Sequence, residues 1–524
     1  MASTGHTPIH SLPPETLIYI FDLVQASSLA LWTPTNSLVA PNPDEILEIS
    51  HVCQRWREVT IGNPRFWRHA NTTNSGYLSV CMERSQDQPL MIAWDTKYQD
   101  RYGLDEPLPP ATETYNILAP HTHRILRLSI SVATKEFIPT LVALLSQPLS
   151  QLEDFIAEGY DESAEAIHLP DDVLQGSPLR YISLNSVRLP FRSLDYSGLS
   201  ELRIFDDHFL SLDNLLDMLE RCPRLEALRL ENTPDIPHSR GDAFEAPKRI
   251  VSLPHLKSVW CNNFGPDIGY ILAHLRFPVE AELSVEYPLY EGRSELLDWI
   301  VPDPDHRPGI LSQIDHINVD LRLNYGRYNE PTYIAGRRDP NMTEWPTSIR
   351  SADVLVAFSD SDEIPRSELR RTILTGFPGM FEGTPIKTLS VNLDDKHVEV
   401  GVWRDMFMAL PSIQRLSITS FDNAGPSPVR VDTLLQSLAV PDGAGIFLLP
   451  ELKQLVLVAS DFGGLDQARA HLEERARGGL KLECLVVSSE SESSEQVAQL
   501  LGLGGLVGLV EYIADPEIMV CRSV

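Results

Sequence analysis

The chain has 524 residues, with 43 Lys and Arg against 73 Asp and Glu, which gives a formal net charge of −30. At roughly 150 residues per domain, this length predicts about three domains, or one small domain followed by a long repeat array. Nucleic acid and anionic membrane surfaces both attract clustered cations, so we expect neither as a partner. Apolar residues make up 43 % of the chain and charged residues 22 %, which argues against wholesale disorder.

The chain is punctuated by 40 prolines and 29 glycines, so its helices and strands should be short. Six cysteines are scattered without CxxC spacing, and no secretory signal opens the sequence. We therefore expect reduced thiols in a cytoplasmic or nuclear protein. No apolar run is long enough to span a bilayer.

Three short helices are expected near the amino end. The first runs from Ser11, which can cap it, to Val24, and it is followed by a polar, proline-bearing loop of about residues 26–43. Its apolar stripe consists of Leu17, Ile20, Phe21 and Val24. A second helix begins near Asp44, and its apolar positions are Ile46, Ile49, Cys53 and Trp56. A third, short element opens at Asn63-Pro64 and carries Phe66 and Trp67.

These helices carry a resemblance to the F-box family. The family pattern is LPxE, an apolar LxxIF helix, a VCxxW helix and a closing PxxW, and all four pieces occur in order. They are Leu12-Pro13-Pro14-Glu15, then Leu17 with Ile20-Phe21, then Val52-Cys53-Gln54-Arg55-Trp56, then Pro64-Arg65-Phe66-Trp67. The long loop between the first two helices departs from the compact pattern and resembles insertions in fungal F-box proteins.

The resemblance implies that the helices bind a Skp-type adaptor, which links an F-box protein to a cullin and its ubiquitin ligase. A small apolar bundle is marginal alone and completes its core on a partner, which fits this role. The candidate adaptor contacts are Leu12, Pro13, Glu15, Leu17, Ile20 and Phe21. Four further residues belong either to the contact or to the domain's own core: Val52, Cys53, Trp56 and Trp67. The alternative is that the helices form only a cap on the larger body.

From about residue 120 the pattern apolar-x-x-apolar-x-apolar recurs, mostly at intervals of roughly 20–40 residues with three longer gaps, which overlaps the range of leucine-rich repeats. Its ten occurrences begin at Ile125, Leu179, Leu199, Leu225, Leu256, Ile314, Ile386, Ile413, Leu452 and Leu482. Amphipathic helices that stop at proline precede several of them, as at Cys222-Pro223. A helix–proline–strand unit cannot bury its own apolar face, so stacking of such units is expected.

This body resembles a degenerate leucine-rich-repeat solenoid of alternating helices and short parallel strands. Residues Asn324 to Arg350 are expected to form a long loop, and Val354-Val356-Phe358 gives a doubtful unit. The expected fold is therefore α/β, with an F-box at 8–72, a linker or irregular cap at 73–118 and repeats at 119–524. An ordinary α/β domain with a mixed sheet is the competing architecture.

No catalytic signature stands out. The chain has neither a GxxxxGK[ST] phosphate loop nor a GxSxG elbow, and its histidines and cysteines do not gather at metal-ligand spacing. We expect no enzymatic activity, no cofactor and no metal. The sequence predicts an adaptor that docks a Skp-type partner and binds an unknown target protein through its repeats. Two alternatives remain: a scaffold that acts outside any ligase, and an enzyme whose residues converge only in the fold.

Overall fold

The computed structural model describes most of the chain, in two compact units, Met1–Ile236 and Pro237–Val524. Each unit is described by itself. The described residues are 12–29, 43–95, 110–132, 135–159, 166–206, 210–232, 247–262, 265–288, 307–321, 332–338, 352–359, 366–393, 398–420, 429–440, 447–459, 462–463, 465–489 and 502–513.

The amino-terminal head consists of α1 (Pro14–Leu29), α2 (Pro43–Val52), α3 (Gln54–Ile61) and the 3₁₀ turn η2 (Pro64–Trp67). The predicted second helix is in fact two helices, because Cys53 adopts an extended conformation (φ −158°, ψ 169°) that interrupts the helical hydrogen bonds and caps α3. The turn η2 forms as predicted: the Asn63 side chain accepts a hydrogen bond from the Arg65 amide, and Pro64 occupies the first position.

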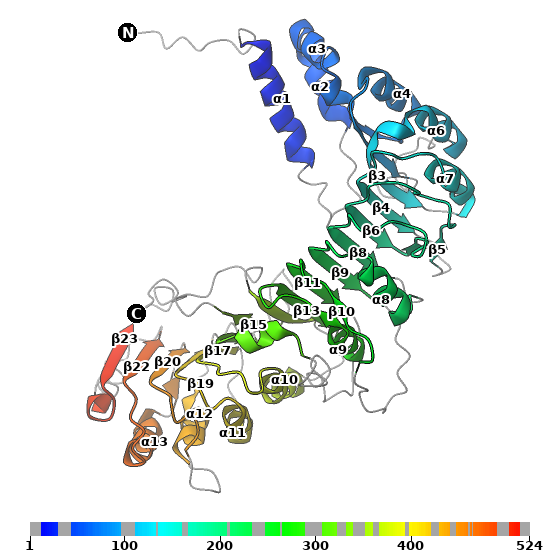
Figure 1. Cartoon of the computed structure of the whole chain (residues 1–524). Helices are drawn as coiled ribbons and strands as arrows, with labels where there is room; N and C mark the ends of the chain where they lie inside the picture. Colours follow the sequence, from blue (N-terminus) through cyan, green and yellow to red (C-terminus); the bar gives the residue numbers. More distant parts are fainter. Residues whose placement is uncertain are drawn as a thin grey trace, which may run out of the picture. The chain divides into compact units, whose positions relative to one another are not determined.

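The first unit contains a parallel sheet whose strands follow the chain order (Figure 1). The strands are β1 (His69–Asn71), β2 (Leu90–Asp95), β3 (Ile125–Val132), β4 (Asp154–Gly159), β6 (Tyr181–Asn185), β8 (Glu201–Phe205) and β9 (Ala227–Glu231). A separate two-stranded pair joins β5 (Ile167–His168) and β7 (Val187–Arg188). One side of the sheet carries α4 (Ser75–Arg84), α6 (Ala111–Leu118), α7 (Ile138–Leu145) and α8 (Leu212–Glu220).

Strand register aligns the repeats and builds the core. Leu128, Phe155, Ile182, Leu202 and Leu228 occupy one register row, and each is at most 1 % exposed. The next row toward the carboxyl ends of the strands contains Ile130, Ala157, Leu184, Ile204 and Leu230, which are also buried. Because successive residues of a strand point to opposite sides, the residues between these rows lie on the side away from the core.

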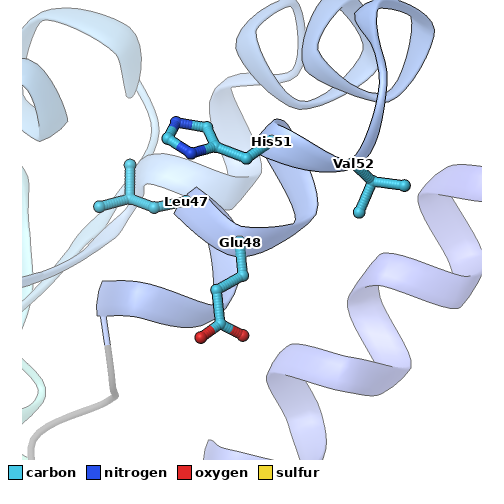
Figure 2. Close-up of a pocket in the computed structure, with 4 residues that line it drawn as sticks. All are labelled: Leu47, Glu48, His51 and Val52. Carbon is cyan, nitrogen blue, oxygen red and sulfur yellow. The ribbon is translucent and has the colours of Figure 1, made fainter.

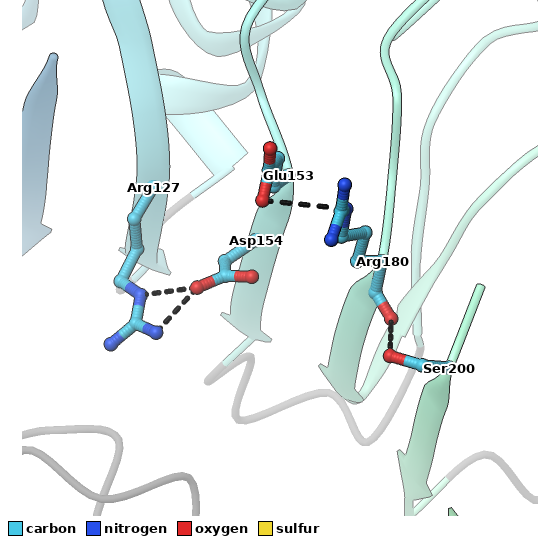
Figure 3. Close-up of polar contacts among 5 residues, drawn as sticks. All are labelled: Arg127, Glu153, Asp154, Arg180 and Ser200. Carbon is cyan, nitrogen blue, oxygen red and sulfur yellow. Dashed lines mark hydrogen bonds and ion pairs between the residues drawn. The ribbon is translucent and has the colours of Figure 1, made fainter. Parts of the chain in front are cut away.

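The amino ends of the strands are tied together by a repeated hydrogen-bond pattern. The carbonyl of Glu153 accepts from the amides of Arg180 and Tyr181 (2.8 and 3.1 Å), and the carbonyl of Arg180 accepts from those of Ser200 and Glu201 (2.8 and 3.0 Å). Figure 3 shows side chains that reinforce this edge: the Ser200 hydroxyl donates to the Arg180 carbonyl (2.9 Å), and Arg180 lies 3.5 Å from Glu153. These exposed contacts add little energy, but they favour one register.

The carboxyl ends of three neighbouring strands share a turn conformation. Ser186, Asp206 and Asn232 each follow a strand and have left-handed φ values of 53°, 51° and 49°. Asp and Asn tolerate this region because their short polar side chains form local hydrogen bonds, and Asn232 Nδ2 donates to Asp206 Oδ1 at 2.7 Å. Asn232 is therefore one of several residue types that occupy this regular position after a strand.

In the described part of the second unit, ten strands form a sheet in which most neighbours are parallel. In spatial order its strands are β11 (Ser258–Asn262), β13 (Glu282–Pro288), β16 (Val354–Ser359), β15 (Thr332–Arg337), β14 (His316–Asp320), β17 (Thr388–Leu393), β18 (Arg415–Ser420), β20 (Gln454–Ala459), β22 (Cys484–Ser489) and β23 (Leu509–Ile513). Its helices are α9 (Gly265–Ala273), α10 (Arg366–Met380), α11 (Val400–Ala409), α12 (Val431–Ala439) and α13 (Leu465–Arg477).

The sequence-based prediction is wrong in one part of this sheet. The stretch expected to be a long loop contains β15, which pairs antiparallel with both β14 and β16. Ile334 at its centre is fully buried, and Gly336 lies so close to Ile314 that a Cβ atom there would be 3.1 Å from Ile314 Cγ2. The doubtful unit at Val354 is the regular strand β16. Burial of Ile334 therefore inserts an antiparallel strand into the otherwise parallel sheet.

Each of the ten predicted apolar triads has its last two residues in a strand. The strand begins at the first apolar residue of the triad or two residues after it. The chain is thus an α/β protein with amino-terminal helices followed by leucine-rich-repeat-like units of helices and short, mostly parallel strands. The domain boundaries at 72 and 118 remain predictions. Strand β1 lies before the first boundary yet pairs with β2, and α4 and β2 lie between the two.

Candidate functional site

The inner side of α1 packs into an aromatic cluster of the head. Leu17 is fully buried and Phe21 is 1 % exposed. The ring of Phe21 lies 4.9 Å from that of Trp56 and 6.0 Å from that of Phe66, in tilted arrangements that favour aromatic pairs. This cluster holds α1 against α3 and η2.

Polar contacts fix both ends of α1. The Arg55 guanidinium donates to the backbone carbonyl of Leu12, just before the helix begins. Toward the other end, Gln25 Nε2 donates to the Phe66 carbonyl (3.2 Å), and Asp22 pairs with Arg65 at 2.5 Å. The orientation of α1, and therefore of its outer side, is set by the head itself.

Trp67 joins the head to the first repeat helix. Its indole is fully buried, and its Nε1 donates to the Thr60 carbonyl at 2.9 Å. The guanidinium of Arg84, in α4, stacks over the indole at 4.4 Å from the ring centroid. A buried tryptophan with a satisfied N–H and a stacked cation is a core residue, so its position favours the packing role among the two predicted for it.

The structure divides the ten predicted contact residues into three groups. Those exposed to solvent are Pro13, Glu15, Val52 and Cys53. Those half-buried are Leu12, Ile20 and Trp56. Those buried in the head are Leu17, Phe21 and Trp67. The residues of the last group pack inside the head, beneath the exposed residues.

The sequence-based analysis missed a second apolar side of α1. Tyr19 is 63 % exposed and Leu23 is 53 % exposed, and they lie one turn apart on the side opposite Leu17 and Phe21. A soluble helix normally keeps its outer side polar, so the exposed apolar side chains on the outer side of α1 make this side a candidate contact surface. The sequence contains this signal as the i, i+4 pair Tyr19 and Leu23, which lies outside the predicted apolar stripe of α1.

A shallow hollow of about 410 Å³ lies on α2. Leu47, Glu48, His51 and Val52 line it, and Figure 2 shows Val52 on the side of α2 nearest α1. Val52 is 60 % exposed although it is apolar. The hollow thus combines two apolar side chains with a carboxylate and an imidazole, a composition that suits a protein interface with a polar rim.

The described residues contain no group of three or more His, Cys, Asp or Glu side chains arranged to hold a metal ion. Burial raises the pKa of the Cys81, Cys222 and Cys261 thiols to about 12, so they are poor nucleophiles. Burial, with smaller effects of Arg68 and Arg127, lowers the pKa of His69 to about 3. Among the helices that the structure describes, none has the length and apolar character to cross a bilayer.

Comparison with known protein families identifies the domain that the amino-terminal helices form. The F-box-like family model matches residues 9–73. The chain carries an F-box-like domain. The matched segment covers α1, α2, α3 and η2 and ends just after β1, so the aromatic cluster and the exposed outer side of α1 both belong to the F-box-like domain.

Two further comparisons concern the whole chain. No curated protein matches it. Among solved structures, it is similar to the leucine-rich repeat-containing protein LegL7 from Legionella pneumophila, at 11 % sequence identity and a TM-score of 0.26, over 72 % of this chain and 99 % of that one. The repeat character of the body rests on its own strands and helices. The fungal type of the F-box stays a prediction.

Proposed function

We propose that this protein is a substrate-recognition adaptor of a Skp–cullin–F-box ubiquitin ligase, in which the F-box-like domain binds a Skp-type adaptor and the repeats bind a target protein. An F-box-like domain beside a repeat array supports a protein-interaction role in general. The ligase role, the binding of a cullin and the binding of a target protein go beyond this general role, and they are what we propose.

The observation that carries the proposal is the two-sided hydrophobicity of α1. Of the ten large apolar side chains that are strongly exposed in the described part of the chain, five belong to the F-box-like domain: Tyr19, Leu23, Val24, Val52 and Ile61. This domain is little more than a tenth of the chain, so the exposed apolar residues are concentrated there. Such concentration is typical of a surface that another protein covers.

The proposed contact surface is the outer side of α1 together with the hollow on α2. It includes four predicted residues that are exposed, Pro13, Glu15, Val52 and Cys53, and adds Tyr19 and Leu23. Phe21 and Leu17 lie beneath it and fix the position of α1. Because Tyr19 and Leu23 are 63 % and 53 % exposed, full burial of both side chains by a partner would contribute about 2–3 kcal/mol.

The proposed role in ubiquitin transfer is proximity. A target held by the repeats beside a charged ubiquitin carrier reacts at a high effective concentration, because the two groups no longer have to meet by diffusion. In this role the chain contributes binding energy rather than a nucleophile. It would act in the cytoplasm or the nucleus, where ubiquitin ligases of this kind operate.

The test is co-purification with a Skp-type adaptor after the outer side of α1 is made acidic. The variant Tyr19→Asp with Leu23→Asp should lose the adaptor while its circular dichroism matches that of the parent, because both side chains lie outside the core. The matched control is Met408→Asp with Val440→Asp, which places the same charges on exposed apolar positions of the second unit (52 % and 46 % exposed) and should keep the adaptor.

Equal recovery of the adaptor with the parent and the α1 variant would remove the docking proposal. A second readout separates a ligase from a scaffold: cullin should be present in the parent complex and absent with the α1 variant. Recovery of the adaptor without cullin would leave a scaffold that acts outside a ligase.

A further inference from the structure

On β20 and β22, both sides of the sheet are buried. Leu455 and Leu457 on β20 belong to the apolar rows that continue from β18 and form the core. Because side chains alternate along a strand, Val456 and Val458 lie on the opposite side. Figure 1 shows α11, α12 and α13 on the same side of these strands, so the other side carries no helix there. Val456 and Val458 are nevertheless only 4 % and 7 % exposed.

The side opposite the core carries an apolar cluster of its own. It consists of Val456 and Val458 on β20 and Val486 on β22, and Cys484 packs against them. Val456 and Val486 are register partners, and Ser488 is the partner of Val458. These five residues are the valine patch.

The valine patch is more buried than the same side of the neighbouring strands. Ser417 and Thr419 on β18 occupy the rows of Val456 and Val458 and are half-buried, and Leu509 on β23 is 50 % exposed. Among the residues that the structure describes, the apolar members of the cluster come from β20 and β22 alone. Since the burial exists in the chain by itself, the cover is a part of this chain and not a partner protein.

Ser488 adds an unpaired polar group to the patch. Its side chain is fully buried, and its hydroxyl has no hydrogen-bond partner in the described part of the chain. A buried hydroxyl without a partner is unfavourable. An extended segment that crosses β22 on this side would present backbone amides and carbonyls to Ser488, as well as apolar side chains to the valines.

We propose that residues 514–524 fold back from the end of β23 and cover the valine patch, with the apolar run Ile518-Met519-Val520 on the valines and Cys521 near Cys484. The segment then occupies part of the open side of the second unit, and a target protein cannot contact that part while the segment is in place.

The reach of this segment fits the patch. Neighbouring strands are about 4.8 Å apart, so β20 lies about 10 Å from β23, and eight extended residues span about 26 Å. Strand β23 ends at Ile513, and Cys484 is the first residue of β22. A segment that leaves the carboxyl end of β23 and turns back therefore passes the valines and reaches Cys484 at about its eighth residue, which is Cys521.

Two other segments outside the described residues adjoin these strands and fit less well. Residues 421–428 connect β18 to β19 (Val429–Arg430), and Phe421 is their one large apolar residue. Residues 490–501 connect β22 to the 3₁₀ turn η8 (Gly502–Gly505) and begin with the acidic run ESESSE. Both have to continue to a described element, whereas residues 514–524 follow the last described strand.

This inference does not depend on adaptor docking, because none of its residues belongs to the F-box-like domain. It rests on the proposed function only in assigning the covered surface to a target protein. The two claims can therefore fail separately.

The test is cross-linking of the reduced full chain with a short bifunctional maleimide, followed by mass spectrometry of the digested protein. In the native chain Cys484 and Cys521 should be joined to each other, within a product that runs as a monomer on a denaturing gel. In urea the preference for this pair should disappear, because the segment no longer lies on the sheet.

The variant Ile518→Asp with Val520→Asp should reduce the joined product about tenfold or more. Charging two covered apolar side chains removes more than the 1.4 kcal/mol that one factor of ten represents. The matched control is Ser523→Asp with Val524→Asp, which adds the same two charges beyond the apolar run and should keep the yield of the parent.

A second readout does not depend on the cysteines. A chain that ends at Ile513, and equally the full-length Ile518→Asp, Val520→Asp variant, should expose the valine patch and bind more of the hydrophobic dye anilinonaphthalene sulfonate than the parent, with an unchanged circular dichroism spectrum. Unchanged dye binding of both would mean that another segment covers the valines, and the inference would be wrong.

Two cross-linking results would also overturn it. One is an equal yield of the joined product from the parent and the Ile518→Asp, Val520→Asp variant. The other is a parent in which both cysteines react with a monofunctional maleimide and are not joined by the bifunctional one. Adaptor co-purification is measured in the same preparations: retention of the adaptor with any of these negative results defeats this inference alone, whereas joined cysteines without the adaptor defeat the docking proposal alone.

Discussion

Replacement of Trp67 by Phe tests whether this residue is a core residue or an adaptor contact. The change removes the hydrogen bond from Nε1 to the Thr60 carbonyl, which is worth about 1 kcal/mol. It leaves a small cavity at a fully buried position, which costs about 1 kcal/mol more, and it weakens the stacking of Arg84 by about 0.5 kcal/mol. The free energy of unfolding should therefore fall by about 2.5 kcal/mol.

Thermal unfolding followed by circular dichroism measures this loss. For a unit of this size, about 2.5 kcal/mol corresponds to a fall in Tm of roughly 5–10 °C. The affinity for the Skp-type adaptor, measured by calorimetry well below the Tm, should stay within about twofold of the parent value, since a change of that size is under 0.5 kcal/mol. An unchanged Tm together with a large loss of adaptor affinity would refute this reasoning and place Trp67 at the contact.

The remaining predictions concern pH, thiol reactivity and truncation. Because the pKa of His69 is about 3 in the fold against an ordinary 6.5, the folded state binds fewer protons between these values. The free energy of unfolding should thus be highest above about pH 6.5 and should decrease below that pH by at most about 1.4 kcal/mol per pH unit. Denaturant titrations of His69→Gln should show a free energy of unfolding that depends less on pH. Among the described cysteines, Cys53 is exposed, so a thiol reagent should label it first in the native protein, and bound adaptor should protect it, as mass spectrometry of the labelled peptide would show. Removal of residues 1–62 should leave a folded body, whereas removal of residues 1–75 also removes β1 and uncovers the edge of β2, so that size-exclusion chromatography should show aggregation. A monodisperse, equally stable 1–75 deletion would contradict the role given to β1.

Much of the body could be predicted because its repeats depend on local patterns. The spacing apolar-x-x-apolar-x-apolar combines a residue that packs before the strand with two that alternate along it, and it located ten strands. Strand β15 escaped the same analysis. Its sequence, TYIAGR, has one large aliphatic residue, Ile334, whose burial depends on β14 and β16 on either side. No local sequence pattern predicts this pairing with strands that are distant along the chain.

The F-box-like domain shows the same division. The motif pieces located the helices and the residues Leu17, Phe21 and Trp67, but not the conformation of Cys53, which interrupts the predicted second helix. Nor did the stripe of α1 reveal which apolar residues lie inside. Periodicity identifies an apolar side, and Tyr19 and Leu23 give α1 a second one, so the choice of the inner side depends on contacts with α3 and η2.

The sequence by itself determined that a small helical F-box-like domain precedes a long array of helix–strand units, since motif order and apolar spacing are properties of neighbouring residues along the chain. Tertiary structure alone decided which side of α1 faces outward, where an antiparallel strand enters the second sheet, and that Val456 lies beside Val486 on the side of the sheet away from the core. These features arise from register and packing between segments distant in sequence, and register is fixed when whole strands pair.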